Sequence, residues 1–196
     1  MEDLGSFKIN NPSNSVKTVN SIYTSPQKNR KVKIYKSYEK ILCGTAGTLI
    51  NNYKFFDNSV GIMIHCDNFT NFNLKKLVEA HEERPLHCLL TMLTFNSSNP
   101  SNCGVVQVNS EKIVQNFFEK EQNPPSNIAN GAVYVFENDF LNWLIENYQD
   151  ATDFSTEILP NLMGKIYTYH TNLPYIDIGT IEALESARKL AKNSFK

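Results

Sequence analysis

The sequence predicts an α/β fold in which a mainly parallel sheet is flanked by helices. Short apolar or alternating runs, typical of strands, take turns along the chain with runs whose apolar residues recur at helical spacing. Strands that alternate with helices in this way pack as a sheet covered on its faces. The length of 196 residues and the 41% hydrophobic content suffice for one domain that buries a core without disulfides or a structural metal.

The first 30 residues contain few apolar side chains and predict one strand near 16–22, so this arm is expected to be poorly ordered or partly paired. The folded domain is expected to span residues 31–196. Alternation predicts a strand over 31–38, and the segment 44–56 predicts a Gly-containing turn followed by a short helix. The apolar run SVGIMIHCD predicts a strand buried on both faces.

The remaining elements continue the alternation to the C-terminus. Asn73 is placed to cap a helix that ends near Arg84, and Thr180 is the expected N-cap of the last helix. Ligands of such sheets lie beyond the carboxyl ends of strands, which directs attention to Asp67 and Asp177. Strands are predicted over 88–95, 104–109, 112–120, 129–136, 165–171 and 175–179, helices over 140–148 and 180–193, and a loop over 121–127.

The charge balance argues against two classes of partner. Nineteen Lys and Arg against twenty Asp and Glu give a net charge of -1, so no nucleic-acid partner and no membrane partner are expected. No apolar run is long enough to span a membrane, and the N-terminus lacks the apolar core of a signal peptide. The four cysteines show no CxxC spacing, so reduced thiols and a cytoplasmic location are expected.

Asp67 and Asp177 are the candidate metal ligands. Both are predicted at or near strand ends, where a hard divalent cation would be shared between carboxylates and substrate oxygens. Mg²⁺ needs only one or two protein carboxylates, so two residues far apart in the sequence suffice. A turn-forming or helix-capping aspartate is the alternative at either position.

Three further segments are candidates for binding a nucleotide or a sugar. Gly44–Gly47 place small residues before a helix, which lets the backbone approach a base or a phosphate, and a plain tight turn is the alternative. Glu119 and Lys120 end a strand and could bind a sugar hydroxyl and a phosphate oxygen, or form a solvated pair. Asn130 lies in an apolar strand, where its amide must find a ligand hydroxyl or a neighbouring backbone group.

The histidines and cysteines give no catalytic site. His65 and Cys66 are adjacent in a predicted strand and so face opposite sides, whereas His81 lies on the apolar face of a predicted helix, where a core histidine is expected. No zinc site is predicted. The sequence has no Gly-x-Ser-x-Gly elbow, and nucleophilic hydrolysis has no support.

Seven motifs in a fixed order carry a family resemblance. They are YEKILCGTAGTL, VGIMIHCDNF, NCGVVQVN, FFEK, SNIANGAVYVF, FSTEILP and YIDIGT. Together they resemble the sugar-1-phosphate nucleotidyltransferase family, of which the mannose-1-phosphate and heptose-1-phosphate guanylyltransferases look nearest. The resemblance runs from about residue 16 to the C-terminus and implies a Rossmann-like fold of the nucleotide-diphospho-sugar transferase type.

The resemblance implies a reaction and a role for each candidate residue. A sugar 1-phosphate oxygen would attack the α-phosphorus of a nucleoside triphosphate, with GTP favoured, and pyrophosphate would leave. Catalysis of this kind is mostly positioning and charge neutralisation. The implied residues are Gly44, Thr45, Ala46 and Gly47 for the base, Asp67 and Asp177 for Mg²⁺, Gly104, Glu119 and Asn130 for the sugar, and Lys120 for the sugar phosphate, with Asp67, Asp177 and Lys120 as the catalytic set.

The N-terminus departs from the family pattern. The family opens with a central strand and a Gly-rich loop around the triphosphate, whereas Gly5 is the only glycine before Gly44, so the domain is expected to be N-terminally truncated. This predicts an unpaired sheet edge, filled by the N-terminal arm or by a second chain, which would make a homo-oligomer. Tyr175 also stands where a Trp is common, and Gly131 precedes Ala132 in the reverse of the usual order. Without the Gly-rich loop the triphosphate site is expected to be incomplete and the activity weak. The alternative function is a non-catalytic domain that retains a sugar-phosphate or nucleotide pocket, or none, and acts by association.

Overall fold

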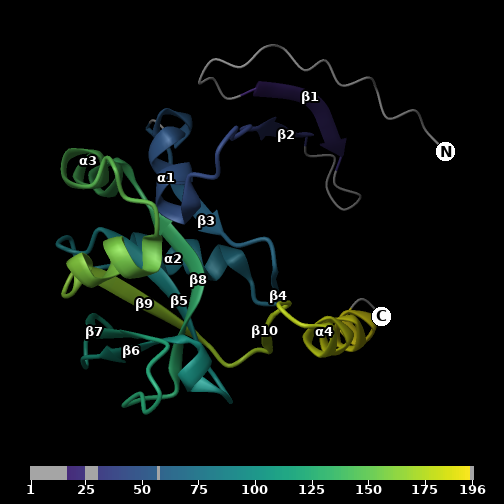
Figure 1. Ribbon diagram of the computed structural model, residues 1–196, viewed down its shortest axis with the longest axis vertical. Coiled ribbons are helices and arrows are strands. Elements are labelled where there is room, and N and C mark those ends of the chain that lie inside the picture. The colour runs from purple at the N-terminus through teal and green to yellow at the C-terminus, as the bar shows by residue number, and fades with distance from the viewer. Residues whose placement is uncertain (1–16, 25–30, 57, 195–196) are drawn as a thin grey trace.

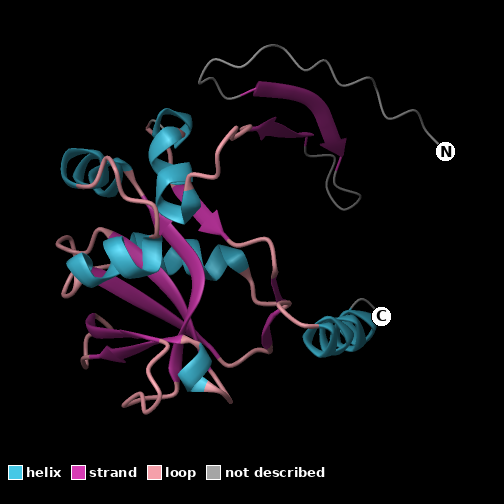
Figure 2. Ribbon diagram, viewed as in Figure 1, coloured by secondary structure: helices cyan, strands magenta, loops and turns pink. Residues whose placement is uncertain are grey.

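The computed structural model describes residues 17–24, 31–56 and 58–194, and it confirms the α/β class with helices that flank a mixed sheet (Figures 1 and 2). The main sheet has six strands in the order β7-β6-β8-β5-β9, with β3 also paired to β8. The strand bounds are β3 Gly61–Ile64, β5 Leu90–Asn96, β6 Gly104–Val108, β7 Val114–Glu119, β8 Ile128–Phe136 and β9 Ile166–Thr171.

The sheet is mixed, and the expectation that it is mainly parallel holds for the direction of most strands but not for their pairing. Among the strand pairs in the described residues only β5 and β9 are parallel, whereas β8 pairs antiparallel with β3, β5 and β6, and β7 pairs antiparallel with β6. β3 and β5 nevertheless run in the same direction, because each is antiparallel to β8, and β9 runs with β5. β6 is antiparallel to β8 as well, so four of the six strands run in one direction, while β7 and β8 run in the other and β8 lies between β3 and β5.

Helices cover both faces of the main sheet. Four helical segments pack on one face and α2 packs on the other (Figure 1). Their bounds are α1 Gly44–Asn51, α3 Asn138–Asn147, η3 Phe154–Ile158 and η4 Leu159–Leu162 on the first face, and α2 Leu74–Glu82 on the second. None of the helices in the described part of the chain is long and apolar enough to cross a membrane.

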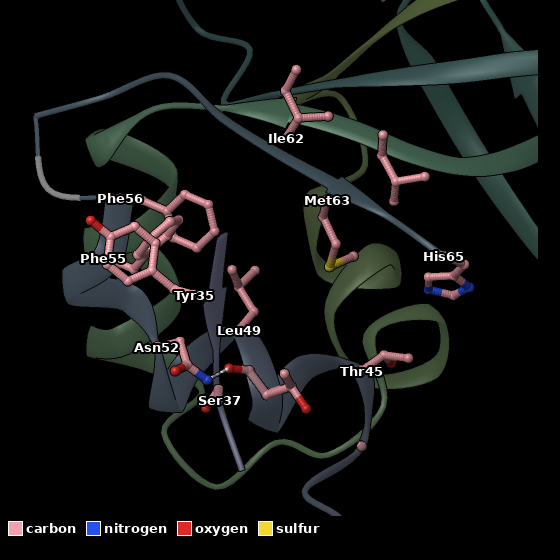
Figure 3. Close-up of a pocket in the computed structure, with 13 residues that line it drawn as sticks. Tyr35, Ser37, Thr45, Leu49, Asn52, Phe55, Phe56, Ile62, Met63 and His65 are labelled. Carbon is pink, nitrogen blue, oxygen red and sulfur yellow. Dashed lines mark hydrogen bonds between the residues drawn. The ribbon is translucent and has the colours of Figure 1, made fainter. Parts of the chain in front are cut away.

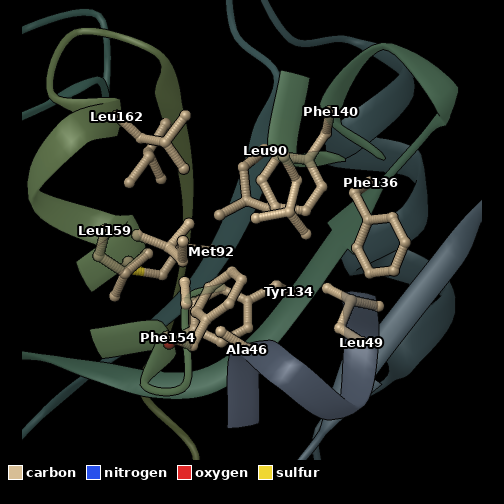
Figure 4. Packing of buried hydrophobic residues seen from close by; sticks show 14 of the residues in the cluster. Ala46, Leu49, Leu90, Met92, Tyr134, Phe136, Phe140, Phe154, Leu159 and Leu162 are labelled. Atoms are coloured by element: carbon tan, nitrogen blue, oxygen red, sulfur yellow. The ribbon is translucent and has the colours of Figure 1, made fainter. Parts of the chain in front are cut away.

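The side chains of β8 divide the core into two parts. Tyr134 and Phe136 join the larger cluster, which also contains Phe140 of α3 (Figure 4). Val133 and Val135 join the smaller cluster beneath α2. Successive residues of a strand point to opposite faces, so the alternation in the sequence ANGAVYVF produces both cores from one strand.

A small two-stranded sheet and the last helix lie beside the main sheet. β4 (Asn68–Thr70) pairs antiparallel with β10 (Tyr175–Asp177), and α4 (Ile181–Ser194) follows (Figure 1). The Thr180 hydroxyl accepts the backbone N–H of Ala183 at 3.1 Å, which confirms the predicted N-cap of α4.

Strand β3 is less buried than its apolar sequence predicts. Ile64 is 49% exposed, and in the described residues β3 pairs with β8 alone. β1 (Lys17–Thr24) and β2 (Lys31–Lys36) pair with each other rather than with β3, so the described part of the arm does not fill this edge. The expected unpaired edge is therefore present among the described residues, while residues 1–16 and 25–30 of the expected arm lie outside them.

His81 of α2 is fully buried, as predicted. Its Nδ1 lies 2.8 Å from the Thr91 hydroxyl, and its Nε2 has no hydrogen-bond partner among the described residues. Burial and the Arg84 guanidinium, opposed by Glu137, lower the pKa of His81 to about 4, and burial has the largest effect. Protonation would place a second N–H donor in the core without an acceptor, so the folded protein keeps this ring neutral.

We expect His81 to make the protein less stable as the pH falls. Its folded pKa of about 4 lies below the ordinary value of 6.5, so its contribution is complete above pH 6.5 and is lost between pH 6.5 and 4. The loss is about 2 kcal/mol at pH 5. Urea unfolding at pH 7 and pH 5 should show this loss in the wild type and not in His81→Asn. His87→Asn, at an exposed histidine, should keep it, and an equal pH dependence in wild type and His81→Asn would contradict the assignment.

Candidate functional site

The two predicted metal ligands lie next to each other. Asn68 pairs with Asp177 across the β4–β10 ladder, and the N–H of Ile178 donates to the carbonyl of Asp67 at 2.8 Å. Both aspartates are exposed, and neither forms an ion pair with a described residue. The helix-capping alternative does not hold for Asp177, because Thr180 caps α4.

Tyr175 connects this pair of carboxylates with strand β8. Its hydroxyl donates to the carbonyl of Gly131, and its ring stacks on Phe95 with the centroids 4.5 Å apart. Burial raises the pKa of Tyr175, and Tyr134, Asp177 and Asp67 raise it further. The hydroxyl is therefore within electrostatic reach of both aspartates.

Asn130 and its neighbours form a bulge in β8. The pairing with β5 shifts register between Met92 and Thr94, and Ala132 has a positive φ of 48°. The Asn130 Oδ1 accepts the N–H of Ala132 at 2.9 Å, and its Nδ2 donates to the Tyr134 hydroxyl at 2.7 Å. Of the two partners considered for this half-buried amide, the structure therefore supplies the neighbouring backbone.

Glu119 and Lys120 lie at the end of β7, facing Gly104. The carboxylate of Glu119 and the ammonium group of Lys120 are 3.8 Å apart, and the Lys120 side chain is 69% exposed. A Cβ on Gly104 would lie 2.7 Å from the Phe117 ring and 2.8 Å from the Glu119 carboxylate, so only glycine leaves room for both. Burial raises the pKa of Glu119, and Lys120 opposes this.

Gly44–Gly47 form the first turn of α1 and are fixed by residues 152–154. The N–H of Ala46 donates to the Thr152 carbonyl at 3.0 Å, and the N–H of Phe154 donates to the Thr45 hydroxyl at 2.9 Å. Gly44 has a φ of +76°, and a Cβ there would lie 2.3 Å from the Thr152 carbonyl oxygen, which explains why glycine stands at this position.

Asp153 lies between the α1 segment and the Glu119–Lys120 pair. Burial disfavours its charged form, but hydrogen bonds from Thr156 and Ser155 and the charge of Lys120 lower its pKa. The charge of Asp153 in turn contributes to the raised pKa of Glu119. Burial raises the pKa of Tyr134, the hydrogen bond with Asn130 lowers it, and the charges of Glu119 and Asp153 raise it, so its hydroxyl is within electrostatic reach of both carboxylates.

The structure thus brings every predicted site residue into one connected region. Sequence reasoning missed three residues that connect its parts: Tyr134, Asp153 and the hydroxyl of Tyr175. The sequence did indicate a helix cap at Asp153, because Asp is a preferred N-cap residue. In the structure its side chain accepts the N–H of Thr156, three residues later, at 2.8 Å. Tyr134 looked like any apolar core residue.

An apolar cavity of about 530 Å³ lies beside Gly44 and Thr45 (Figure 3). Phe55 and Phe56 of η1 (Tyr53–Phe56) line it opposite Met63 of β3, and it extends to the unpaired edge of that strand. Polar groups at its rim include the amide of Asn52, which donates to the Thr48 carbonyl at 2.8 Å.

The carboxylate pair fits a hard divalent cation. Both carboxylates are exposed and neither has a cationic partner among the described residues, so each is available to a cation. Oxygen ligands are the ones that Mg²⁺ prefers. No group of three or more metal-binding side chains occurs in the described part of the chain, so substrate oxygens and water would complete the coordination.

Similar proteins of known sequence are glucose-1-phosphate adenylyltransferases. The enzyme from Clostridium acetobutylicum is 25% identical over 154 residues, which is 74% of this chain and 40% of the relative. The one from Mycoplasma mobile is 26% identical over 161 residues, which is 76% of this chain and 42% of the relative. The chain therefore spans less than half the length of these relatives.

Similar solved structures show the same fold. HddC from Yersinia pseudotuberculosis aligns with a TM-score of 0.64 and 23% identity, over 81% of this chain and 65% of that one. Its complex with GMP-PN aligns with a TM-score of 0.63 and 24% identity, over the same shares of the two chains. A structure described as a glucose-1-phosphate thymidylyltransferase from Bacillus anthracis, in complex with a sucrose, aligns with a TM-score of 0.68 and 20% identity. The alignment covers 81% of this chain and 64% of that one.

The profile of the nucleotidyl transferase family matches residues 7–194, nearly the whole chain. The sequence relatives act, by their names, on a sugar 1-phosphate. The chain therefore belongs to the nucleotidyl transferase family.

Proposed function

We propose that the protein transfers a nucleotidyl group from a nucleoside triphosphate to a sugar 1-phosphate. The observation that supports this best is the adjacency of Asp67 and Asp177 on two strands that Tyr175 attaches to the β8 bulge, whose Tyr134 hydroxyl is within electrostatic reach of Glu119. Such a site offers the carboxylates of Asp67 and Asp177 to a metal ion. It offers the ammonium group of Lys120 to a phosphate and the carboxylate of Glu119 to hydroxyl groups. These are the groups that a phosphate ester of a sugar requires.

The chemistry needs no nucleophilic side chain. An oxygen of the sugar phosphate forms a bond to the α-phosphorus, the bond from that phosphorus to the bridging oxygen breaks, and pyrophosphate leaves. Lys120 would hold the sugar phosphate, and Glu119 would accept hydrogen bonds from sugar hydroxyls. Fixed groups of this kind act by positioning and by neutralising charge.

Asp67 and Asp177 would hold Mg²⁺ against the phosphates, where the ion would neutralise charge. The chain's own contribution is to fix the two carboxylates. The 2.8 Å bond between the N–H of Ile178 and the carbonyl of Asp67 keeps β4 and β10 in register, so the two aspartates stay on neighbouring segments of backbone.

For the base we propose a purine, with guanine favoured. The cavity beside Gly44 and Thr45 has apolar walls from Phe56 and Met63 and amide and hydroxyl groups at its rim, which suits a flat base with polar edges. HddC, of similar fold, was solved with GMP-PN, whereas the sequence relatives are adenylyltransferases. For the sugar we propose mannose or a heptose, which rests on the motif resemblance alone.

A second function is supported by the open edge of β3. Strand β3 lacks a second neighbour in the described residues, and the cavity beside it is open, so the nucleotide side has fewer fixed walls than the sugar side. A domain built this way could bind nucleotide sugars without turning over triphosphates.

Release of pyrophosphate tests the main proposal. We expect GTP, Mg²⁺ and mannose 1-phosphate to give pyrophosphate, and ATP or dTTP with glucose 1-phosphate to give less. Lys120→Ala should lower the rate by about 100-fold or more, because it removes a fixed positive charge beside the phosphate. Lys189→Ala, on the exposed face of α4, should leave the rate unchanged. Binding of nucleotide sugars without pyrophosphate release from any substrate pair would favour the second function.

Metal binding can be measured without turnover. We expect Mn²⁺ together with GDP-mannose to raise the melting temperature, because ligands that bind only the folded state stabilise it. Asp67→Asn and Asp177→Asn should each abolish the increment due to Mn²⁺, whereas Asp150→Asn, at an exposed site outside β4 and β10, should retain it. An unchanged increment in both site variants would contradict the proposed ligands.

A variant of Glu119 can distinguish the contribution of the sugar to binding from that of the nucleotide. Glu119→Gln should weaken the binding of GDP-mannose by about 10-fold or more and leave GDP unaffected, because hydrogen bonds to charged groups are worth about 1.5–3 kcal/mol. Isothermal titration calorimetry measures both ligands. Glu121→Gln changes the same residue type at an exposed position nearby and should change neither. Equal weakening of GDP and GDP-mannose by Glu119→Gln would contradict a sugar contact.

A further inference from the structure

The carbonyl of Gly131 receives two side-chain hydrogen bonds from the small sheet. The Tyr175 hydroxyl donates to it from β10, and the Asn68 Nδ2 donates to it from β4 at 3.4 Å. These two strands also carry the carboxylate pair, since Asp177 lies two residues after Tyr175 and Asp67 directly precedes Asn68. The cation side of the site is therefore attached to β8 through one acceptor.

The acceptor lies inside the bulge that positions Asn130. Gly131 is buried, and a Cβ there would lie 3.1 Å from the carbonyl oxygen of Leu93 on β5. The hydrogen bond from the Ala132 N–H to the Asn130 Oδ1 closes the bulge on itself. A shift of the Gly131 carbonyl would therefore move Asn130 as well.

The ring and the hydroxyl of Tyr175 have separable roles. The ring is held by stacking on Phe95, with the centroids 4.5 Å apart and the planes at 25°. This contact needs no hydroxyl, so the ring would keep its place in Tyr175→Phe. The hydroxyl alone makes the link to Gly131.

We propose that Tyr175 is a positioning residue that couples the binding of a divalent cation at Asp67 and Asp177 to the binding of a sugar phosphate beside Asn130. The coupling passes from β10 through the Tyr175 hydroxyl to the Gly131 carbonyl and the bulge. It rests on the proposed function of these two groups, and it adds a thermodynamic link between them.

Coupling of this kind must be reciprocal. If the cation fixes β4 and β10, it also fixes the bulge in the form that receives the sugar, and the sugar then raises the affinity for the cation by the same factor. One hydrogen bond of ordinary strength supplies a factor of about five. Asn68, whose bond to the same carbonyl is long, should contribute a smaller factor.

The test is a binding cycle with two ligands. Mn²⁺ affinity is measured from the electron paramagnetic resonance signal of the free ion, with and without saturating GDP-mannose, in the wild type and in Tyr175→Phe. The enhancement is the factor by which GDP-mannose raises the Mn²⁺ affinity. Direct contact between the diphosphate and the ion is the same in both proteins, so the ratio of the two enhancements measures the contribution of the Tyr175 hydroxyl to the coupling. We expect the enhancement to fall by about fivefold in Tyr175→Phe, while Mn²⁺ affinity without the nucleotide sugar changes less than about twofold.

Two variants make the outcome decisive. Tyr148→Phe removes a hydroxyl from a tyrosine that packs on Trp143, away from the bulge, and should keep the full enhancement. Asn68→Ala should lower it by less than Tyr175→Phe does. An enhancement that is unchanged in Tyr175→Phe, or absent in the wild type, would overturn the coupling. Mn²⁺ binding that Asp67→Asn leaves unchanged would instead overturn the proposed metal site, and the coupling with it.

Discussion

Hydrogen bonding along both edges of β8 is the constraint on which the candidate site depends. β5 occupies one edge of β8, and β3 and β6 share the other, so the strand cannot slide without breaking two ladders. The bulge at Asn130 is therefore held at a fixed height in the sheet, and the Gly131 carbonyl points to a place where side chains from β4 and β10 reach it. Hydrogen bonds to this single carbonyl thus connect the small sheet, which carries both aspartates, to the main sheet.

The charged groups of the candidate site have few partners within the described chain. Burial and Asp153 both raise the pKa of Glu119, and the one short contact that opposes this is a 3.8 Å pair with an exposed lysine. Asp67 and Asp177 lie side by side with no ion pair to a described residue. A cation would give these two carboxylates a partner. A phosphate would do the same for Lys120, and sugar hydroxyls would do so for Glu119.

Much of the local structure was predictable from the sequence, because it depends on neighbours along the chain. The caps at Asn73 and Thr180, the buried His81 and the order of strands and helices all follow from periodicity and capping chemistry. Strand direction was not predictable in this way, because the side-chain pattern of β8 is the same whether it runs parallel or antiparallel to β5. The links made by Tyr175 and Thr45 join residues 44 and 109 positions apart, and nothing in the local sequence announces them.

The two halves of the site differ in how firmly the described chain fixes them. Asn130 lies on β8, which is bonded along both edges, and the carboxylate pair is tied to β8 through Tyr175. The nucleotide side instead borders β3, which has one partner and exposes Ile64 at its end. A group on a strand held by two ladders loses its conformational entropy when the protein folds. A group beside a free edge loses conformational entropy only when the ligand binds, which weakens the binding. The binding free energy of a nucleotide sugar should therefore come mainly from the sugar and diphosphate side, with the base contributing less than its contact area suggests.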